Sequence, residues 1–327
     1  MLLKFFKQTL PQVIIVSIIV AFLLWFKSLF TDQFYTFYFD SIKMPIYAFV
    51  TSWASENSMY SKALSFLVMI FAAFYLLTIN SKHIVIKQRT YLPAFFYILL
   101  VSCFISIQRI NPAVFAGLFI VFAIDHVFSI YHKENALDNI FRAGFFIGLA
   151  SIFYVPAVLY LLALLLSIMS IRTFNVREWI ASLFGVITPW FFFSLYEFLV
   201  YGDFKLAYKS ININLFTPVN QDNEGFLIYI FYAYCIVLFL VTGFYLLKTL
   251  PTQKISVRKF HGAFFWMNLV SASIFVLIPT VSFELAYIAA VPLTFQFAHY
   301  FTTSKRRFWP EFLFLLLIVI AGLMQFY

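Results

Sequence analysis

Ionisable side chains are scarce in this sequence, so each one in an apolar stretch is a candidate for chemistry. Only 11% of the 327 residues are charged, whereas 64% are hydrophobic. Glu197 and Glu284 lie within or at the ends of apolar runs, where a charge is costly and is a functional candidate by default. Asp32 and Asp40 lie in an aromatic-rich stretch after the first apolar run. Carboxylates can act there as general bases or as ligands of a divalent cation.

One basic residue stands out as a candidate for binding phosphate. Arg109 is the only arginine in the segments that we predict to be extracytoplasmic, and it stands beside Asn111 at a predicted helix start. A guanidinium binds phosphate through paired hydrogen bonds. Two ordinary roles remain open: Arg109 as an interfacial residue that extends its charge into water, and Asp32 as a simple acid at a helix end.

Signatures of soluble enzymes are absent from the sequence. It contains no Gly-rich phosphate loop, no nucleophile elbow and no Cys or His residues at metal-binding spacing. Cys103 and Cys235 fall inside apolar runs, which is typical of small buried hydrophobes. We predict that the histidines near the cytoplasmic ends of spans are interfacial, with Asp125 and His126 forming an interfacial pair or, alternatively, a proton relay. The five are His83, His126, His132, His261 and His299.

The element that must position these residues is a membrane helix. A soluble domain has about 25% charged residues, far more than this chain. In lipid, an apolar run of about 20 residues forms a helix, because its backbone N–H and C=O groups must form hydrogen bonds with one another. We therefore predict an all-α polytopic transmembrane bundle of about 10–11 spans in a single membrane domain, 1–327. The predicted spans are 11–30, 63–80, 93–109, 112–131, 141–153, 155–171, 179–200, 226–248, 262–280, 283–301 and 310–327.

Basic residues predict the orientation. Of the 22 Lys and Arg residues, 16 fall in the predicted inner segments and five in the outer ones, while Lys27 lies in the first span. This bias places the N-terminus in the cytoplasm. The +9 charge sits in short clusters between spans, which argues against nucleic-acid binding. Two outer segments are long: 31–62, whose aromatic patches predict one or two short interfacial helices, and 201–225, a polar loop or lid.

Residues 108–179 resemble the GT-C superfamily of membrane glycosyltransferases, which use polyprenyl-phosphate-linked sugars. A span begins at Asn111–Pro112, a helix with Gly144, Gly148 and Ala150 follows, and a Tyr154–Pro156 break comes next. Thr31-Asp32-Gln33 matches the acidic position that the superfamily places after the first span. The resemblance implies a GT-C-like module over 11–200, including the outer loop 31–62, followed by residues 201–327 with the second loop and the C-terminal spans.

The resemblance also implies roles. Asp32 or Asp40 would be the catalytic carboxylate, and Arg109, Asn111, Tyr154 and Glu284 would bind substrate. A divalent cation is a possible cofactor, although no metal ligands are assigned. The sequence departs from the superfamily pattern at three places: the double acid is Asp32–Gln33, the frequent Lys at the break is Tyr154, and the acid beside the proline is Asn111.

Three functions therefore remain open. The first is a glycosyltransferase-like protein that acts on lipid-linked sugar at the extracytoplasmic face. The second is a non-catalytic subunit of an envelope assembly or secretion complex, with protein partners in the membrane. The third is a transporter or flippase, which the placement of charges at span ends disfavours. The whole chain also resembles an uncharacterised family of bacterial inner-membrane proteins, which predicts a bacterial cytoplasmic membrane location in contact with membrane lipid.

Overall fold

The protein is built from helices throughout the part of the chain that is described. The computed structural model describes residues 2–8, 10–31, 43–53, 58–202, 205–216, 226–306 and 308–326, and these contain no strand. The α-helices are α1 (Leu2–Phe6), α2 (Pro11–Phe30), α4 (Pro45–Ser52), α5 (Met59–His83), α6 (Leu92–Ser102), α7 (Pro112–Phe128), α8 (Leu137–Phe153), α9 (Tyr160–Ile171), α10 (Val176–Tyr201), α11 (Lys205–Phe216), α12 (Phe226–Thr249), α13 (Ile255–Leu277), α14 (Ala286–Thr303) and α15 (Phe308–Leu323). The 3-10 turns are η1 (Ile105–Ile107), η2 (Val155–Leu159), η3 (Leu250–Thr252) and η4 (Phe283–Leu285).

Five of these helices are long and apolar enough to cross a membrane: α2, α5, α10, α12 and α13. Shorter apolar helices, including α6, α7 and α15, complete the bundle. Each predicted span coincides with a helix, which confirms the all-α membrane fold. The helix at the predicted span 93–109 is shorter than expected, because the chain turns extended at Phe104 before η1. Since every residue of α6 is buried, protein rather than lipid surrounds this short helix.

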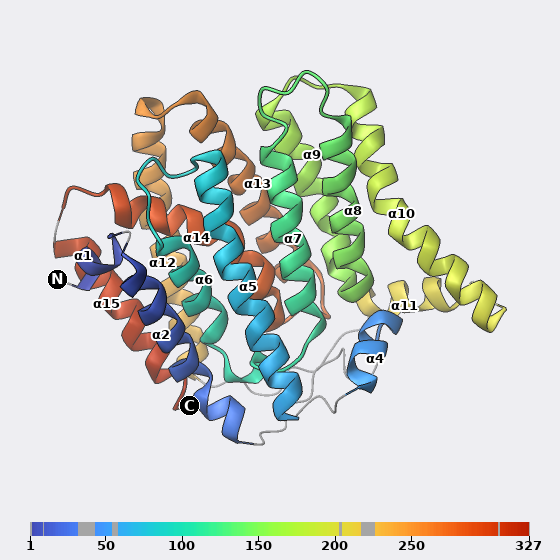
Figure 1. The fold of residues 1–327 in the computed structure, drawn as a ribbon, viewed down its shortest axis with the longest axis horizontal. Coiled ribbons are helices and arrows are strands. Elements are labelled where there is room, and N and C mark those ends of the chain that lie inside the picture. Colours follow the sequence, from blue (N-terminus) through green and yellow to red (C-terminus); the bar gives the residue numbers. More distant parts are fainter. Residues whose placement is uncertain are drawn as a thin grey trace.

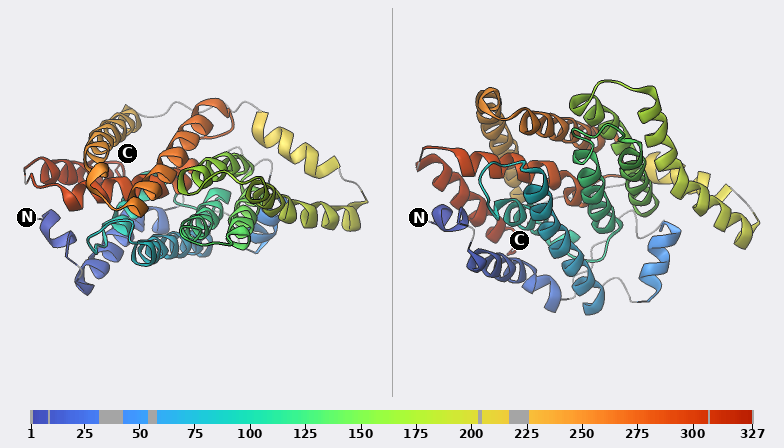
Figure 2. Two further views of the ribbon diagram at one scale, coloured as in Figure 1. Left: turned by 90° about the horizontal axis from the view of Figure 1, so that it is seen from above. Right: turned by 45° about the horizontal axis from the view of Figure 1, so that its top comes forward.

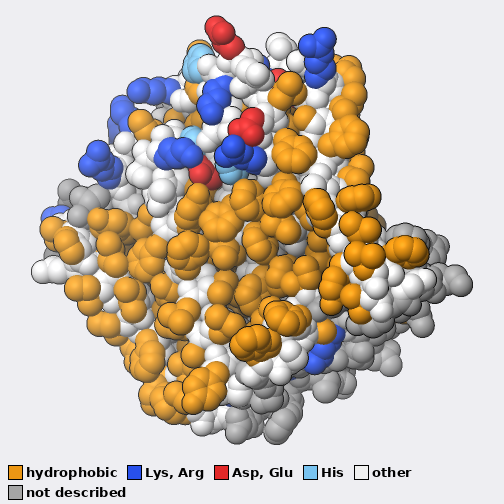
Figure 3. Space-filling model, turned by 45° about the vertical axis from the view of Figure 1, so that its right-hand side comes forward, with side chains coloured by type: hydrophobic (Ala, Val, Ile, Leu, Met, Phe, Trp, Pro, Cys, Tyr) orange, Lys and Arg blue, Asp and Glu red, His pale blue; other side chains and the backbone are white. Residues whose placement is uncertain are grey.

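The turns between the helices gather at two opposite ends of the bundle (Figure 1). We call one the basic end: it carries the turns 84–91, 129–136, 172–175 and 250–254, which hold Lys87, Arg89, Lys133, Arg172 and Lys254. The other, the loop end, carries α4, η1, η2, α11 and η4. Figure 3 shows Lys, Arg, Asp and Glu side chains gathered at the basic end above a broad hydrophobic surface. Exposed apolar residues on that scale mark a surface that lipid covers.

Glycines let α8 and α10 approach closely. A Cβ at Gly148 would lie 2.7 Å from the carbonyl oxygen of Val186, and one at Gly185 would lie 2.9 Å from the nitrogen of Phe145. Small residues serve helix contacts in membranes in this way, because they let backbones meet. Beyond this contact α10 runs outward from the body of the bundle, and α11 returns from its far end (Figure 2).

The predicted helix break between the fifth and sixth spans is confirmed. α8 ends at Phe153, Tyr154 is extended, and η2 begins at Val155 with Pro156 in its first turn. Proline suits this place, since it lacks an N–H group and starts a helix more readily than it continues one. The loop 31–62 contains the short helix α4, as predicted. Its Tyr47 is buried, while Phe49 and Trp53 are exposed.

Candidate functional site

Two of the predicted substrate-binding residues meet at the loop end. The hydroxyl of Tyr154, at the end of α8, donates a hydrogen bond to Oε1 of Glu284 in η4 at 3.1 Å. Both side chains are buried, with 6% of Tyr154 and 1% of Glu284 exposed. The break at Tyr154–Pro156 turns the phenol toward the loop between α13 and α14, so the sequence feature that ends α8 also builds this contact.

The Glu284 carboxylate is held by its own turn as well. The backbone N–H of Ser282 donates to Oε1 at 3.0 Å, and the Ser282 hydroxyl makes a short hydrogen bond to Oε2. The hydrogen bonds from Ser282 and Tyr154 thus reach both oxygens of this buried carboxylate. Burial, together with the charge of Glu284, raises the pKa of Tyr154 far above its ordinary value. The Tyr154 phenol therefore stays protonated and acts as the donor in its hydrogen bond to Glu284.

A small cavity lies beside this pair, under α4 and α11. Its volume is about 20 Å³, which is room for about one water. Thr280 donates to the carbonyl oxygen of Asn214 at 2.7 Å, which ties α11 to the loop before η4. Tyr47 donates to the carbonyl oxygen of Ile110 at 3.1 Å, which ties α4 to the start of α7. The lining residues are Met44, Tyr47, Pro112, Phe153, Tyr154, Val155, Pro156, Asn214, Thr280 and Glu284.

Asn111 shapes the turn that carries Arg109. Its side-chain oxygen accepts from the N–H of Val114 at 3.0 Å, and its amide donates to the carbonyl oxygen of Ile107 at 3.0 Å. Asn111 thus caps α7, a role in which its side chain satisfies a free N–H of the first turn. Arg109 is buried, with 5% exposed, but it is not among the described residues that line the cavity.

The two catalytic candidates, Asp32 and Asp40, lie outside the described residues. The chain leading to Asp32 is nevertheless fixed. Lys62, 3% exposed, donates from Nζ to the carbonyl oxygen of Thr31 at 2.9 Å, and Ser28 donates to the carbonyl oxygen of Gln108 at 2.6 Å. These contacts bring the end of α2 to the residue before Arg109. The contact of Lys62 with Thr31 was not predicted, because it joins residues that are 31 positions apart in the sequence.

Other candidate residues lie away from the Tyr154–Glu284 pair. Asp125 binds Lys82 at 2.9 Å and His83 at 2.7 Å and accepts from Tyr75 at 3.1 Å. His126 instead stacks on Phe146, with the ring centroids 5.5 Å apart. Glu197, the other acid in an apolar run, is buried within α10.

Two histidines differ from the interfacial role predicted for them. His261 and His299 are buried, with ring centroids 5.1 Å apart, inside the bundle. The reason is helix length: α13 begins at Ile255 rather than at the predicted 262, so His261 lies almost two turns inside it.

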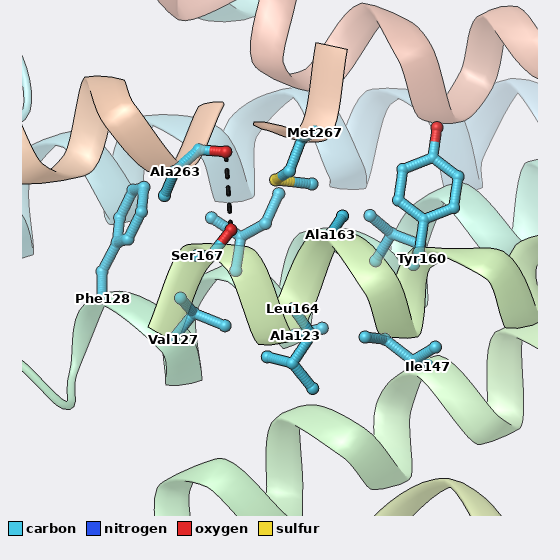
Figure 4. Close-up of a pocket in the computed structure, with 12 residues that line it drawn as sticks. Ala123, Val127, Phe128, Ile147, Tyr160, Ala163, Leu164, Ser167, Ala263 and Met267 are labelled. Atoms are coloured by element: carbon cyan, nitrogen blue, oxygen red, sulfur yellow. Dashed lines mark hydrogen bonds between the residues drawn. The ribbon is translucent and has the colours of Figure 1, made fainter. Parts of the chain in front are cut away.

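A second small cavity lies between α7, α8, α9 and α13 (Figure 4). It too has a volume of about 20 Å³, and nearly all of its lining is apolar. The hydroxyl of Ser167 is its main polar group, and this hydroxyl already donates to the carbonyl oxygen of Ala263 at 3.5 Å. An apolar void of this kind stays dry, so it is a packing feature rather than a binding site.

No metal centre is evident in the part of the chain that is described, where no three His, Cys, Asp or Glu side chains are grouped to hold an ion. Asp32 and Asp40 are outside those residues.

Comparison with known proteins identifies the fold. No protein-family model and no curated protein sequence matches the chain. Among solved structures, the crystal structure of the Archaeoglobus fulgidus oligosaccharyltransferase in its apo form is similar, with a TM-score of 0.52 and 10% sequence identity. The chain therefore shares the fold of this membrane oligosaccharyltransferase. The similarity covers 97% of this chain but only 56% of the archaeal protein, so the chain spans about half the length of that protein.

Proposed function

We propose that this protein is a GT-C-type membrane glycosyltransferase that acts on a polyprenyl-phosphate-linked sugar at the extracytoplasmic face. The observation that carries the proposal is the GT-C-like fold over 97% of the chain, with the buried Tyr154–Glu284 pair at the end opposite the basic turns. The bias of Lys and Arg toward the basic end supports a cytoplasmic position for that end and an outer position for the site.

The reaction assigns one task to each candidate. The acceptor hydroxyl gives its proton to the carboxylate of Asp32 or Asp40 as its oxygen forms a bond to the anomeric carbon. The bond from that carbon to the phosphate oxygen breaks, and polyprenyl phosphate leaves with the electron pair. Arg109 binds the departing phosphate, since a guanidinium stabilises the charge that develops there. Glu284 orients Tyr154 through their hydrogen bond and holds the shape of the cavity.

Entry of substrate requires movement of α4 and α11. A cavity of about 20 Å³ holds one water and no sugar ring. Among the described residues, the contacts that close it include Tyr47 to Ile110, Thr280 to Asn214, and Asn214 to the Met44 sulfur at 3.8 Å. Segments that cover a site commonly open and close around a substrate.

A transfer assay tests the proposal. The purified protein in proteoliposomes is given a panel of polyprenyl mono- and diphosphate sugars, with and without a chelator, and released polyprenyl phosphate or diphosphate is measured. We expect turnover with at least one donor, lost in Asp32→Asn or Asp40→Asn and retained in Glu134→Gln, a control at an exposed carboxylate of the basic end. Turnover unchanged in both Asp32→Asn and Asp40→Asn contradicts the catalytic assignment.

A second function has one observation in its favour. Tyr154 and Glu284 satisfy each other and fill the position where the superfamily often has a phosphate-binding lysine. A non-catalytic subunit built on the same fold predicts no turnover with any donor and a stable complex with another envelope protein on purification from native membranes. The two results separate the functions.

A further inference from the structure

A groove opens between the first turns of α8 and α10, at the basic end and away from the site described above. Leu137, Asp138 and Phe141 form one wall, and Arg177, Ile180 and Ala181 form the other. Its volume is about 510 Å³, in the range of sites that bind small ligands. It is open at the surface, so a ligand can enter from the side of the bundle.

The charge available in this groove is positive. Arg177 is exposed, and no described side chain pairs with its guanidinium. The acid in the groove, Asp138, already accepts from Nε of Arg142 at 3.0 Å. The acid next to Arg177, Glu178, faces Arg172 at 3.5 Å. Both neighbouring carboxylates therefore have their own cations, and Arg177 is left to attract an anion.

An apolar stripe leads from the groove along α10 toward the loop end. Ile180, Phe184, Ile187 and Phe191 are all exposed. Their spacing of four, three and four residues places them on one face of the helix. A ligand that fits has an anionic head beside Arg177 and a long apolar tail along this stripe.

We propose that this groove binds an anionic phospholipid, with its phosphate at Arg177 and an acyl chain against Ile180 and Phe184. The site consists only of residues of α8 and α10 at the basic end. Lipid binding there does not depend on the proposed glycosyl transfer. The site places the lipid beside the contact of Gly144 with Gly185, so the lipid also braces the crossing from which α10 runs outward.

Native mass spectrometry of the intact protein tests the proposal. Detergent-solubilised protein is delipidated and titrated with dioleoyl phosphatidylglycerol or dioleoyl phosphatidylcholine. We expect the anionic lipid to be retained more strongly. We expect Arg177→Gln to weaken its binding roughly fivefold, the worth of one basic residue at a membrane surface. Arg258→Gln, which removes an exposed arginine from α13, is the matched control and should bind as the wild type does.

Two further arms define the ligand. Ile180→Asn, at an exposed position, should weaken binding of the long-chain lipid while the charge at Arg177 remains. Dihexanoyl phosphatidylglycerol and inorganic phosphate should bind far more weakly than the dioleoyl lipid. Equal retention of both dioleoyl lipids, an equal loss in Arg258→Gln, or phosphate binding as strong as that of the dioleoyl lipid overturns the proposal.

Discussion

The Tyr154 hydroxyl lies 3.1 Å from the Glu284 carboxylate, although 130 residues separate them in the sequence. The bond joins the helix break after α8 to the turn before α14, and it lies beneath α4 and α11. A buried carboxylate without such partners would be costly. The hydrogen bond between Tyr154 and Glu284 therefore stabilises the loop end of the bundle, independently of any reaction at that end.

The close contact of α8 and α10 predicts a sharp response to one methyl group. Gly185→Ala would bring its Cβ against the carbonyl oxygen of Phe141 and to 2.9 Å from the nitrogen of Phe145. Overpacking of this kind costs about 1–3 kcal/mol, so the unfolding temperature in detergent should fall. Gly322→Ala, with nothing within 4 Å of the new methyl, is the control and should leave the temperature unchanged or slightly higher. Equal behaviour of the two variants would argue against the observed crossing.

Local patterns in the sequence predicted the helices well. The first span, 11–30, coincides with α2, and the break at Pro156 is present. Apolar runs and prolines act within one segment, so they can be read directly. The site was only partly predictable. Tyr154 and Glu284 were both named, but nothing in either segment indicates that their side chains touch.

Partners from distant helices were the main features missed. Asp125 binds Lys82 and His83 of α5 rather than its neighbour His126, because successive residues of a helix point in different directions. The buried pair of His261 and His299 was missed because the predicted start of α13 was seven residues late. The roles of Asp32 and Asp40 stay predictions, since both lie outside the described residues.

Asp125 should matter more than a surface acid. It is nearly buried and binds Lys82 and His83, and removal of one partner from a buried ion pair costs several kcal/mol. Because Lys82 is half exposed, solvent reduces that value, and we expect Asp125→Asn to cost roughly 1–3 kcal/mol. Asp138→Asn breaks an exposed pair with Arg142 and should cost no more than about 0.5 kcal/mol. Unfolding in detergent measures both, and equal effects would contradict the difference in burial.

Orientation in the membrane is open to a direct test. The bias in Lys and Arg predicts that Ser58 and Asn220 face the extracytoplasmic side. In a background with Cys103 and Cys235 replaced, a cysteine at either position should react with an impermeant thiol reagent added to intact cells or right-side-out vesicles. A cysteine at Lys254, in a turn of the basic end, should react only after the membrane is opened. The reverse pattern would place the proposed site in the cytoplasm.

The catalytic assignment predicts different effects for the candidate bases, for Arg109 and for Tyr154. Loss of a general base costs about 10²–10⁴-fold in rate, so Asp32→Asn, or Asp40→Asn if Asp40 is the base, should abolish measurable transfer while the unfolding temperature stays near that of the wild type.

Arg109→Gln should weaken use of the phosphate donor, and Arg109→Lys should restore only part of it, because lysine lacks the paired donors of a guanidinium. Tyr154→Phe should lower stability by about 1–3 kcal/mol, since it removes a hydrogen bond from the buried Glu284 carboxylate. Initial rates across a range of donor concentrations, together with melting curves of each variant, separate these effects. If Arg109→Gln melts far below the wild type but keeps the same rate per folded molecule, Arg109 supports the fold and the phosphate must bind elsewhere.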